Sequence, residues 1–371
     1  MASNAGAPPS NHDPTIVDLP GLANRLEGDD RERFSRLIRV TEATGHLRAP
    51  SSMHEWITRL FGSVQAVEEQ TIVKTTNLVT MEGTLFNALR ASRPFESGHS
   101  EEVDQVVSSG AGDPFCKPLE GTPEDVFGRV QGRRSLTASN VAKYDAFHGV
   151  VIFNEHNPLG FDQESISDAI DVGLEWGQRA LQEDPAAKYL FFLWNCLWKS
   201  GASILHGHAQ VVATRDLHFA KVEGLRRQAA AYRATHGTSY FDDLVAAHRA
   251  LGLVKDVGDA AIVTNLTPIK EKEVLLIAPD IGADLRRAIW HVLDCFVHHL
   301  GVTSFNLVIY MPPLAPVAED WSGFPRVVRI VDRGEATNKT ADVGAMELYA
   351  SSVVSSDPFR VAAALRQDAA G

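Results

Sequence analysis

Residues 194–210 have the sequence WNCLWKSGASILHGHAQ, which holds the densest group of chemically capable side chains in the chain. We expect its last part to be a strand. Side chains alternate between the two faces of a strand, so His206, His208 and Gln210 would project from one face. Gly207 and Ala209 would leave the opposite face small enough for close packing. The pattern therefore predicts three polar side chains that meet at one place.

The pattern resembles the active-site run of the histidine-triad superfamily, in its transferase branches. The hydrolase branch ends this run H-x-H-x-H, whereas galactose-1-phosphate uridylyltransferases and diadenosine tetraphosphate phosphorylases end it H-x-H-x-Q. In the uridylyltransferases an asparagine lies eleven residues before the first histidine and a serine three residues before it. Asn195 and Ser203 occupy those positions here. The resemblance implies transfer of a nucleotidyl group through a histidine.

The residue types suit that chemistry. A neutral imidazole can approach a phosphorus surrounded by negative oxygens without charge repulsion, and we predict that His208 is the nucleophile. Gln210 can hydrogen-bond a phosphoryl oxygen but cannot pass a proton, which favours an anionic acceptor over water. Asn195 and Ser203 would donate to the charge that grows on the phosphoryl oxygens. The predicted substrates are a nucleotide sugar, such as a UDP-sugar, and a sugar phosphate.

Three other interpretations stay open. His206 and His208 could be ordinary polar residues of a half-buried strand, or ligands of a metal unrelated to catalysis. The enzyme could be a phosphorylase that moves an adenylyl group from a dinucleoside polyphosphate or an ADP-sugar to inorganic phosphate. The chain could also be a nucleotide-binding sensor that has lost turnover. A covalent nucleotidyl adduct would separate the sensor from the enzymes.

Composition restricts the class of protein. The chain has 371 residues, of which 44% are hydrophobic and 22% charged, as in ordinary globular proteins. A net charge of −12 argues against a general nucleic-acid binder. The longest apolar runs have the length of strands, so we expect no membrane span. Three scattered cysteines cannot form a disulfide framework, and the amino terminus lacks the pattern of a signal peptide. We expect a cytoplasmic enzyme.

The periodicity of apolar residues predicts where helices and strands lie. Helices are expected at 29–47, 162–181 and 282–300, with a long helical region at 215–253. Strands are expected at 83–95, 150–153, 190–195, 204–214, 260–265, 273–278, 306–310 and 326–331.

The two halves of the chain share an order of strands and helix, which indicates an internal duplication. We predict an α+β fold made of a duplicated histidine-triad-like unit, with antiparallel sheets and flanking helices. The predicted parts are a disordered tail (1–28), a first half that carries the histidines (29–215) and a second half (216–371). The uridylyltransferases have such a duplicated fold, and the resemblance also implies a homodimer.

The resemblance implies a zinc site in the first half. Asp113-Pro114-Phe115-Cys116 resembles the C-P-x-C element of the uridylyltransferases, with aspartate in place of the first cysteine. In that family two cysteines, a later histidine and the first histidine of the H-x-H pair hold zinc. The corresponding positions are Asp113, Cys116, His156 and His206. A carboxylate, a thiolate and two imidazoles are competent ligands for tetrahedral zinc.

Further motifs predict substrate contacts. Arg90 and Arg93 lie in an R-A-x-R-P element, whose arginines approach the nucleotide phosphates in the uridylyltransferases. Asn140 resembles the asparagine of an element near the nucleotide in the phosphorylases, although a turn asparagine followed by an exposed lysine is the better single interpretation. Lys339 and Glu347 lie where the uridylyltransferases contact the sugar phosphate. The second half departs from the resemblance because 325–329 hold no histidine.

Overall fold

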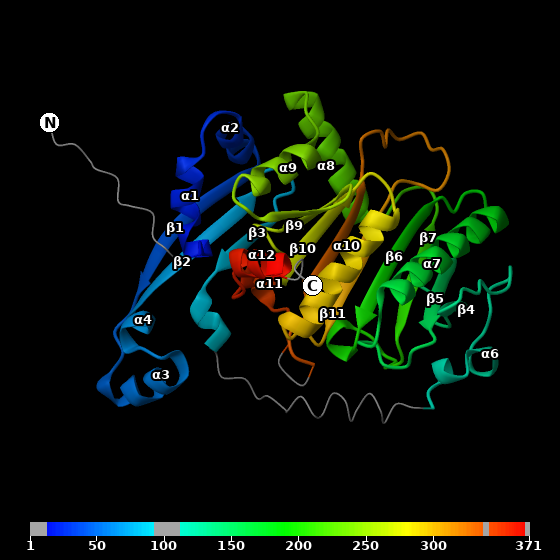
Figure 1. Ribbon diagram of the computed structural model, residues 1–371, viewed down its shortest axis with the longest axis horizontal. Coiled ribbons are helices and arrows are strands. Elements are labelled where there is room, and N and C mark those ends of the chain that lie inside the picture. The colour runs from blue at the N-terminus through cyan, green and yellow to red at the C-terminus, as the bar shows by residue number, and fades with distance from the viewer. Residues whose placement is uncertain (1–12, 93–111, 337–340, 368–371) are drawn as a thin grey trace.

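The fold consists of two sheets with helices on both sides of the larger one (Figure 1). The computed structural model describes residues 13–92, 112–336 and 341–367. None of the helices in these ranges combines the length and apolar character that crossing a membrane requires.

The larger sheet has nine strands, and every neighbouring pair in it is antiparallel. In spatial order the strands are β4 (Ser135–Ser139), β5 (Phe147–Phe153), β7 (His208–Thr214), β6 (Tyr189–Cys196), β11 (Phe305–Tyr310), β12 (Arg326–Asp332), β10 (Glu271–Ala278), β9 (Ala260–Thr264) and β8 (Val254–Val257). The sheet contains two units of four strands, β4-β5-β7-β6 and β9-β10-β12-β11. In each unit the strands, counted along the chain, lie in the spatial order first, second, fourth, third, and a helix (α7 or α10) connects the second strand to the third. The predicted duplication is therefore present, with the two units joined where β6 meets β11.

The smaller sheet has four strands, in the order β1 (Ile38–His46), β2 (Glu69–Asn77), β3 (Gly83–Phe86) and β13 (Ser352–Val354). Its β13 pairs with β3 in parallel, so the end of the chain returns to the amino-terminal part.

The described residues form α-helices, short 3-10 helices and a π-helix. The α-helices are α1 (Leu19–Arg25), α2 (Gly28–Leu37), α3 (His54–Phe61), α4 (Val64–Glu68), α6 (Pro118–Gly121), α7 (Gln163–Glu183), α8 (Ala220–His236), α9 (Tyr240–Arg249), α10 (Ala283–Asp294), α11 (Ala345–Tyr349) and α12 (Pro358–Gln367). The 3-10 helices are η1 (Ile16–Asp18), η2 (Ser51–Met53), η3 (Ala88–Ser92), η4 (Pro114–Cys116) and η5 (Trp198–Ser200), and η6 (Cys295–His299) is a π-helix.

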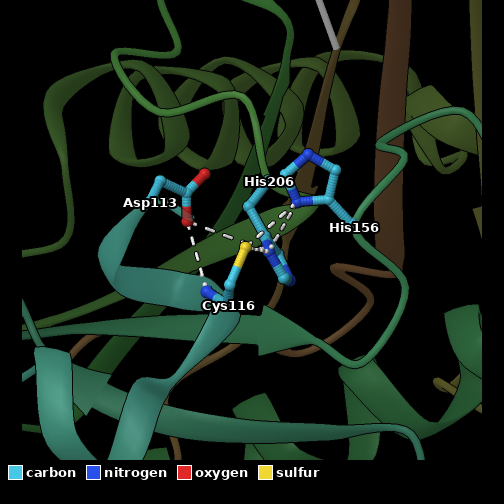
Figure 2. Close-up of side chains that lie close together, drawn as sticks. All are labelled: Asp113, Cys116, His156 and His206. Carbon is cyan, nitrogen blue, oxygen red and sulfur yellow. Dashed lines mark hydrogen bonds and ion pairs between the residues drawn. The ribbon is translucent and has the colours of Figure 1, made fainter. Parts of the chain in front are cut away.

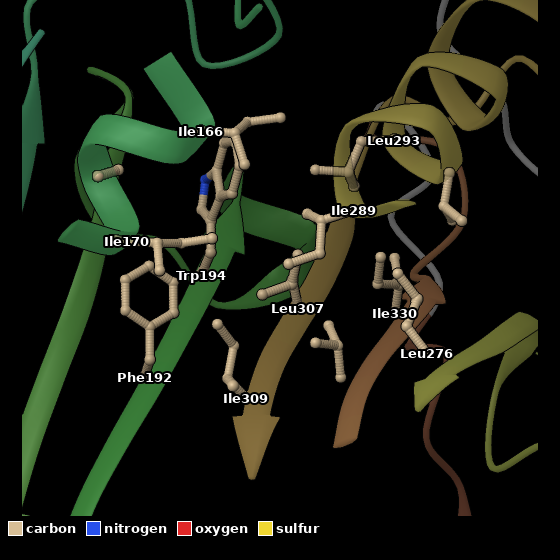
Figure 3. Close-up of a cluster of buried hydrophobic side chains, with 14 of the residues drawn as sticks. Ile166, Ile170, Phe192, Trp194, Leu276, Ile289, Leu293, Leu307, Ile309 and Ile330 are labelled. Carbon is tan, nitrogen blue, oxygen red and sulfur yellow. The ribbon is translucent and has the colours of Figure 1, made fainter. Parts of the chain in front are cut away.

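The main core lies between the larger sheet and the two long helices α7 and α10. Figure 3 shows apolar side chains of both helices meeting those of the central strands. In β7, Ala209 and Val211 face this core, so His208 and Gln210 face the other side of the sheet. On that other side, α2, α9 and the β1–β2 hairpin cover the second unit. In the first unit this face carries His208, Gln210 and a small apolar cluster of Phe115, Ala138, Val150 and Ile152.

Several element boundaries differ from the sequence prediction. The helix expected at 29–47 ends at Leu37, because residues 38–46 form β1 and pair along their whole length with β2. The strand expected at 83–95 ends at Phe86 and continues as η3. The helical region at 215–253 is two helices, broken at Gly237, whose φ of +75° a glycine adopts readily. The helix expected at 282–300 gives way to the π-helix after Asp294.

The strand expected at 204–214 begins only at His208. Before it, Gly207 is held by backbone hydrogen bonds to His156 and Phe153. A Cβ on Gly207 would lie 3.0 Å from the Phe153 ring and 3.1 Å from the Glu155 carbonyl oxygen, so the close approach favours glycine. His206 therefore lies in a loop, and the prediction that it shares a strand face with His208 and Gln210 is wrong.

The disordered tail predicted for 1–28 is wrong for its second part. Residues 16–25 form η1 and α1, and the side chains of Ile16 and Leu19 are buried in the core that includes α2. Residues 1–12 lie outside the described ranges. The division of the chain into halves near residue 216 stays a prediction.

Candidate active site and metal site

His208 is the first residue of β7 and pairs with Ile152 of β5. Its Nδ1 lies 2.8 Å from the backbone carbonyl oxygen of His206. A carbonyl oxygen can only accept, so Nδ1 carries the proton and Nε2 keeps a lone pair. The ring is 7% exposed and meets the edge of Phe115, with ring centroids 5.2 Å apart. Burial lowers the pKa of His208, which keeps the imidazole neutral near pH 7.

Gln210 is held by a second histidine, His148 of β5. The backbone N–H of Tyr144 donates to His148 Nδ1 at 3.0 Å, so the proton of the neutral ring is on Nε2. Nε2 then donates to Gln210 Oε1, 2.9 Å away. Burial lowers the pKa of His148 and favours this neutral form. Because its oxygen is engaged, the Gln210 amide has its NH₂ group left to donate to a ligand.

Asn195 and Ser203 differ in their surroundings. Asn195 lies in β6, two residues beyond Leu193, whose pairing with Gln210 is the last one between β6 and β7. Because Trp194 and Cys196 on either side of it face the main core, the Asn195 side chain lies on the same sheet face as Gln210 and His208. Ser203 is exposed in the loop that precedes β7. The structure thus brings His208, Gln210 and Asn195 to one sheet face and places Ser203 on the loop beside it.

Asp113, Cys116, His156 and His206 form a group that could hold a metal ion (Figure 2). They come from η4 and its N-cap, the loop after β5 and the loop before β7. One ligand atom from each lies within 4.8 Å of the others. The four positions that the resemblance implied are therefore together, although Cys116 and His206 are ninety residues apart along the chain.

The geometry of this group fits tetrahedral coordination. Cys116 Sγ lies 3.4 Å from His156 Nδ1 and 3.6 Å from His206 Nδ1, and the two Nδ1 atoms are 3.1 Å apart. With usual bond lengths, a tetrahedral zinc site would place sulfur and nitrogen about 3.6 Å apart and two nitrogens about 3.3 Å apart. His206 Nε2 donates to the Phe153 carbonyl oxygen at 2.7 Å, which leaves its Nδ1 lone pair facing the group.

Asp113 completes the group and also caps η4. Its Oδ1 accepts from the backbone N–H groups of Phe115 and Cys116 and lies 3.9 Å from His206 Nδ1. Its Oδ2 is buried and has no hydrogen-bond partner within the part of the chain that the structure describes. A buried carboxylate oxygen without a partner is costly, and a bound cation would satisfy it.

The other predicted site residues differ in their position relative to His208 and Gln210. Asn140 lies beside the His148 that holds Gln210, with its Nδ2 3.2 Å from His148 Nε2, and its Oδ1 accepts from Ala142 N in a turn. Arg90 lies in η3, which follows a strand of the smaller sheet. Glu347 lies in α11, where its carboxylate accepts from Gly344 N. Arg93 and Lys339 lie outside the described residues. All five remain predicted substrate contacts.

The sequence prediction missed two residues. His148 supports Gln210, and Asn306 of β11 donates to Asn195 Oδ1 at 2.6 Å. The signal for His148 was a polar residue at the start of the apolar run 147–153, beside a strand that could pair with the H-x-H segment. Asn306 gave no local signal, because its role depends on β11 pairing with β6.

Several solved structures resemble this chain in fold. An ADP-glucose phosphorylase from Arabidopsis thaliana, solved with bound ADP-glucose, has a TM-score of 0.60 and 19% identity, covering 79% of this chain and 97% of that one. A GALT-like protein from the same plant gives 0.58 and 18%, with the same coverage. A uridylyltransferase gives 0.54 and 15%, covering 66% of this chain and 88% of that one.

No protein-family model matches the chain, and no curated protein matches it significantly in sequence. At identities below 20% the structural likenesses concern the fold, and they confirm the α+β fold that was expected from the sequence. The chain has the duplicated histidine-triad-like fold that is found in uridylyltransferases and in ADP-glucose phosphorylase.

Proposed function

We propose that the protein is a nucleotidyltransferase that moves a nucleoside monophosphate group from a nucleotide sugar, or a similar nucleoside diphosphate compound, to a sugar phosphate or phosphate. The observation that carries the proposal is the state of His208. Its Nδ1 proton is held by the His206 carbonyl oxygen, so that Nε2 offers a lone pair on the sheet face that Gln210 and Asn195 share.

The reaction has two displacements. His208 Nε2 attacks the α-phosphorus, a P–N bond forms, and the bond to the bridging oxygen breaks, with its electron pair leaving on the β-phosphate. The imidazole then carries a positive charge, which the His206 carbonyl oxygen stabilises through the Nδ1 proton. In the second step a phosphate oxygen of the acceptor attacks the phosphorus, and the P–N electron pair returns to Nε2.

The neighbouring amides support both steps. Gln210 keeps its NH₂ group available because His148 engages its oxygen, and Asn195 lies on the same sheet face as the imidazole. Donors of this kind stabilise the charge that develops on the phosphoryl oxygens, and each is worth roughly 10²-fold in rate. Neither amide can take a proton from water. An acceptor that is already an anion therefore reacts in preference to water.

We also propose that Asp113, Cys116, His156 and His206 hold zinc. The donor set and the fit of the distances support a structural site closed by four protein ligands. When bound, the ion would neutralise the Cys116 thiolate and the Asp113 carboxylate and would hold three chain segments together. Contacts among the four side chains fix the loop that contains His206. The backbone carbonyl oxygen of His206 in turn orients the His208 ring.

A phosphorylase would use the same His208 chemistry, with inorganic phosphate as acceptor, so the acceptor must be found by assay. A panel of UDP-glucose and ADP-glucose, each with hexose 1-phosphate or inorganic phosphate, separates the two activities. A nucleotide-binding sensor would bind the donors without forming a covalent adduct.

The first prediction concerns the nucleophile. Replacing His208 with asparagine should abolish the covalent nucleotidyl adduct and lower turnover by about 10⁴-fold or more, because no nitrogen lone pair remains to attack phosphorus. The measurement is incubation with a labelled nucleotide sugar, followed by detection of label on the denatured protein. The exposed His236 of α8 supplies a control, His236→Asn, which should label normally. A His208→Asn protein that still labels would contradict the assignment.

The second prediction concerns transfer against hydrolysis. Gln210→His should raise the share of free nucleoside monophosphate among the products several-fold, since an imidazole at that position can exchange a proton with water. The ratio of nucleoside monophosphate to transfer product is measured with and without acceptor. Rapid hydrolysis by the unmodified protein in the absence of acceptor would overturn the transferase proposal.

The third prediction concerns the metal. The purified protein should contain about one zinc per chain, and Cys116→Ala should lose it and lower the melting temperature by roughly 5 °C. Elemental analysis and thermal unfolding measure the two effects, with His236→Asn as the control. If Cys116→Ala kept both its metal content and its melting temperature, the four residues would not be a zinc site.

A further inference from the structure

Asn195 is tied to the second unit of the fold. It lies directly opposite Asn306 of β11, and the two side chains face the same side of the sheet as His208. Asn306 Nδ2 is 2.6 Å from Asn195 Oδ1 and 3.0 Å from the Ser200 carbonyl oxygen. The Asn195 amide, on the sheet face of the proposed nucleophile in the first unit, is thus held by a side chain of the second.

The orientation of both amides follows from a third residue, Arg333. Its guanidinium donates to Asn306 Oδ1, and an arginine has no acceptor. Asn306 must therefore turn its oxygen to Arg333 and its NH₂ group to Asn195 and Ser200, whose carbonyl also requires a donor. Asn195 must then accept with its oxygen. Its own NH₂ group then points away from Asn306 and lies near Gly201, 4.0 Å from where a Cβ of that residue would be.

Arg333 is itself held in place. Its Nε and Nη2 donate to the two oxygens of Asp342, at 2.8 and 2.9 Å. The Lys270 ammonium also pairs with Asp342. Arg333, Lys270 and Asp342 side chains are 17–24% exposed, so this group is largely shielded from water and from screening by salt. A bidentate pair of this kind fixes the plane of the guanidinium.

We propose that Asn306 is a positioning residue of the site, anchored by Arg333, and that its role is to keep the Asn195 amide turned with its NH₂ group toward the phosphoryl oxygens. The inference rests on the proposed nucleotidyl transfer. It makes the second unit, which has no H-x-H pair of its own, a contributor to the chemistry of the first. His148 has the same role for Gln210. Each of the two amides is therefore oriented by a series of hydrogen bonds that starts at a group that can only donate, which is Arg333 for Asn195 and the backbone N–H of Tyr144 for Gln210.

The test is Asn306→Asp, a substitution of nearly equal shape. Aspartate still accepts from Arg333, and gains an ion pair with it, but cannot donate to Asn195. The Asn195 amide must then rotate and present its oxygen to the phosphate. We expect the rate of nucleotidyl-His208 formation in a single turnover at saturating donor to fall about 10- to 100-fold. The melting temperature should change little, because the new ion pair with Arg333 offsets the donor that the Ser200 carbonyl loses, and the KM for the donor should change much less than kcat.

A merely structural role gives the opposite result, since the new ion pair with Arg333 would keep the strands together and leave the rate unchanged. Gln70→Glu in β2 is the matched control. It also replaces an amide by a carboxylate, removes a donor to the Val67 carbonyl and adds one negative charge, but it lies in the smaller sheet. Its rate of adduct formation should equal that of the unmodified protein.

A double-mutant cycle with Asn195→Ala shows whether Asn306 acts through Asn195. In the Asn195→Ala background, Asn306→Asp should have no further effect on adduct formation, because there is no amide left to orient. Equal effects in both backgrounds would overturn the inference. Should Asn306→Asp not fold, Asn306→Ala serves in the same cycle, with an expected loss of about 10-fold in the single variant.

The two proposals fail in different ways. If the unmodified protein forms no adduct with any donor, the nucleotidyl transfer itself is wrong. If the unmodified protein forms the adduct and folded Asn306→Asp forms it at the same rate, the transfer stands and the positioning role is wrong.

Discussion

The antiparallel pairing of β6 with β11 is the contact on which the arrangement of the site depends. It joins the two units into one nine-stranded sheet and brings Asn195 opposite Asn306. Since α7 and α10 cover the same face of that sheet, the opposite face is the one on which polar side chains of both units can meet. A slip of one residue in this register would turn the asparagine of the shifted strand into the apolar core and separate it from its partner.

Backbone groups determine the tautomers of the histidines at the site and the orientation of the polar side chains that depend on them. Backbone carbonyl oxygens, which only accept, hold the Nδ1 proton of His208 and the Nε2 proton of His206. A backbone N–H, which only donates, fixes the tautomer of His148. Because these partners cannot reverse their roles, the lone pairs and amide groups are oriented before any ligand binds. Such preorganisation avoids a reorganisation cost during reaction.

The loop before β7 connects the candidate metal group to His208, the proposed nucleophile. The side chain of His206 belongs to the metal group, while its carbonyl oxygen accepts from His208. A shift of the His206 backbone on disruption of the candidate metal group would move this carbonyl oxygen and with it the imidazole of His208. Stability of the metal group and competence of the active site are therefore expected to change together, although the metal group lies beside the reaction and not within it.

Local sequence was sufficient for the features that depend on neighbouring residues. The apolar periodicity predicted the order of strands and helices, and with it the fold class and the duplication, because side-chain periodicity follows from backbone geometry. The resemblance of the H-x-H-x-Q run to a known superfamily supplied the candidate nucleophile. Pairing between distant segments was not accessible in this way. Residues 38–46 form a strand because β2 pairs with them, and His206 leaves the strand because Gly207 is bonded to the end of β5. His148 and Asn306 became recognisable only once β5 and β11 were in register with β7 and β6, since a hydrogen bond between residues 62 or 111 positions apart leaves no local pattern.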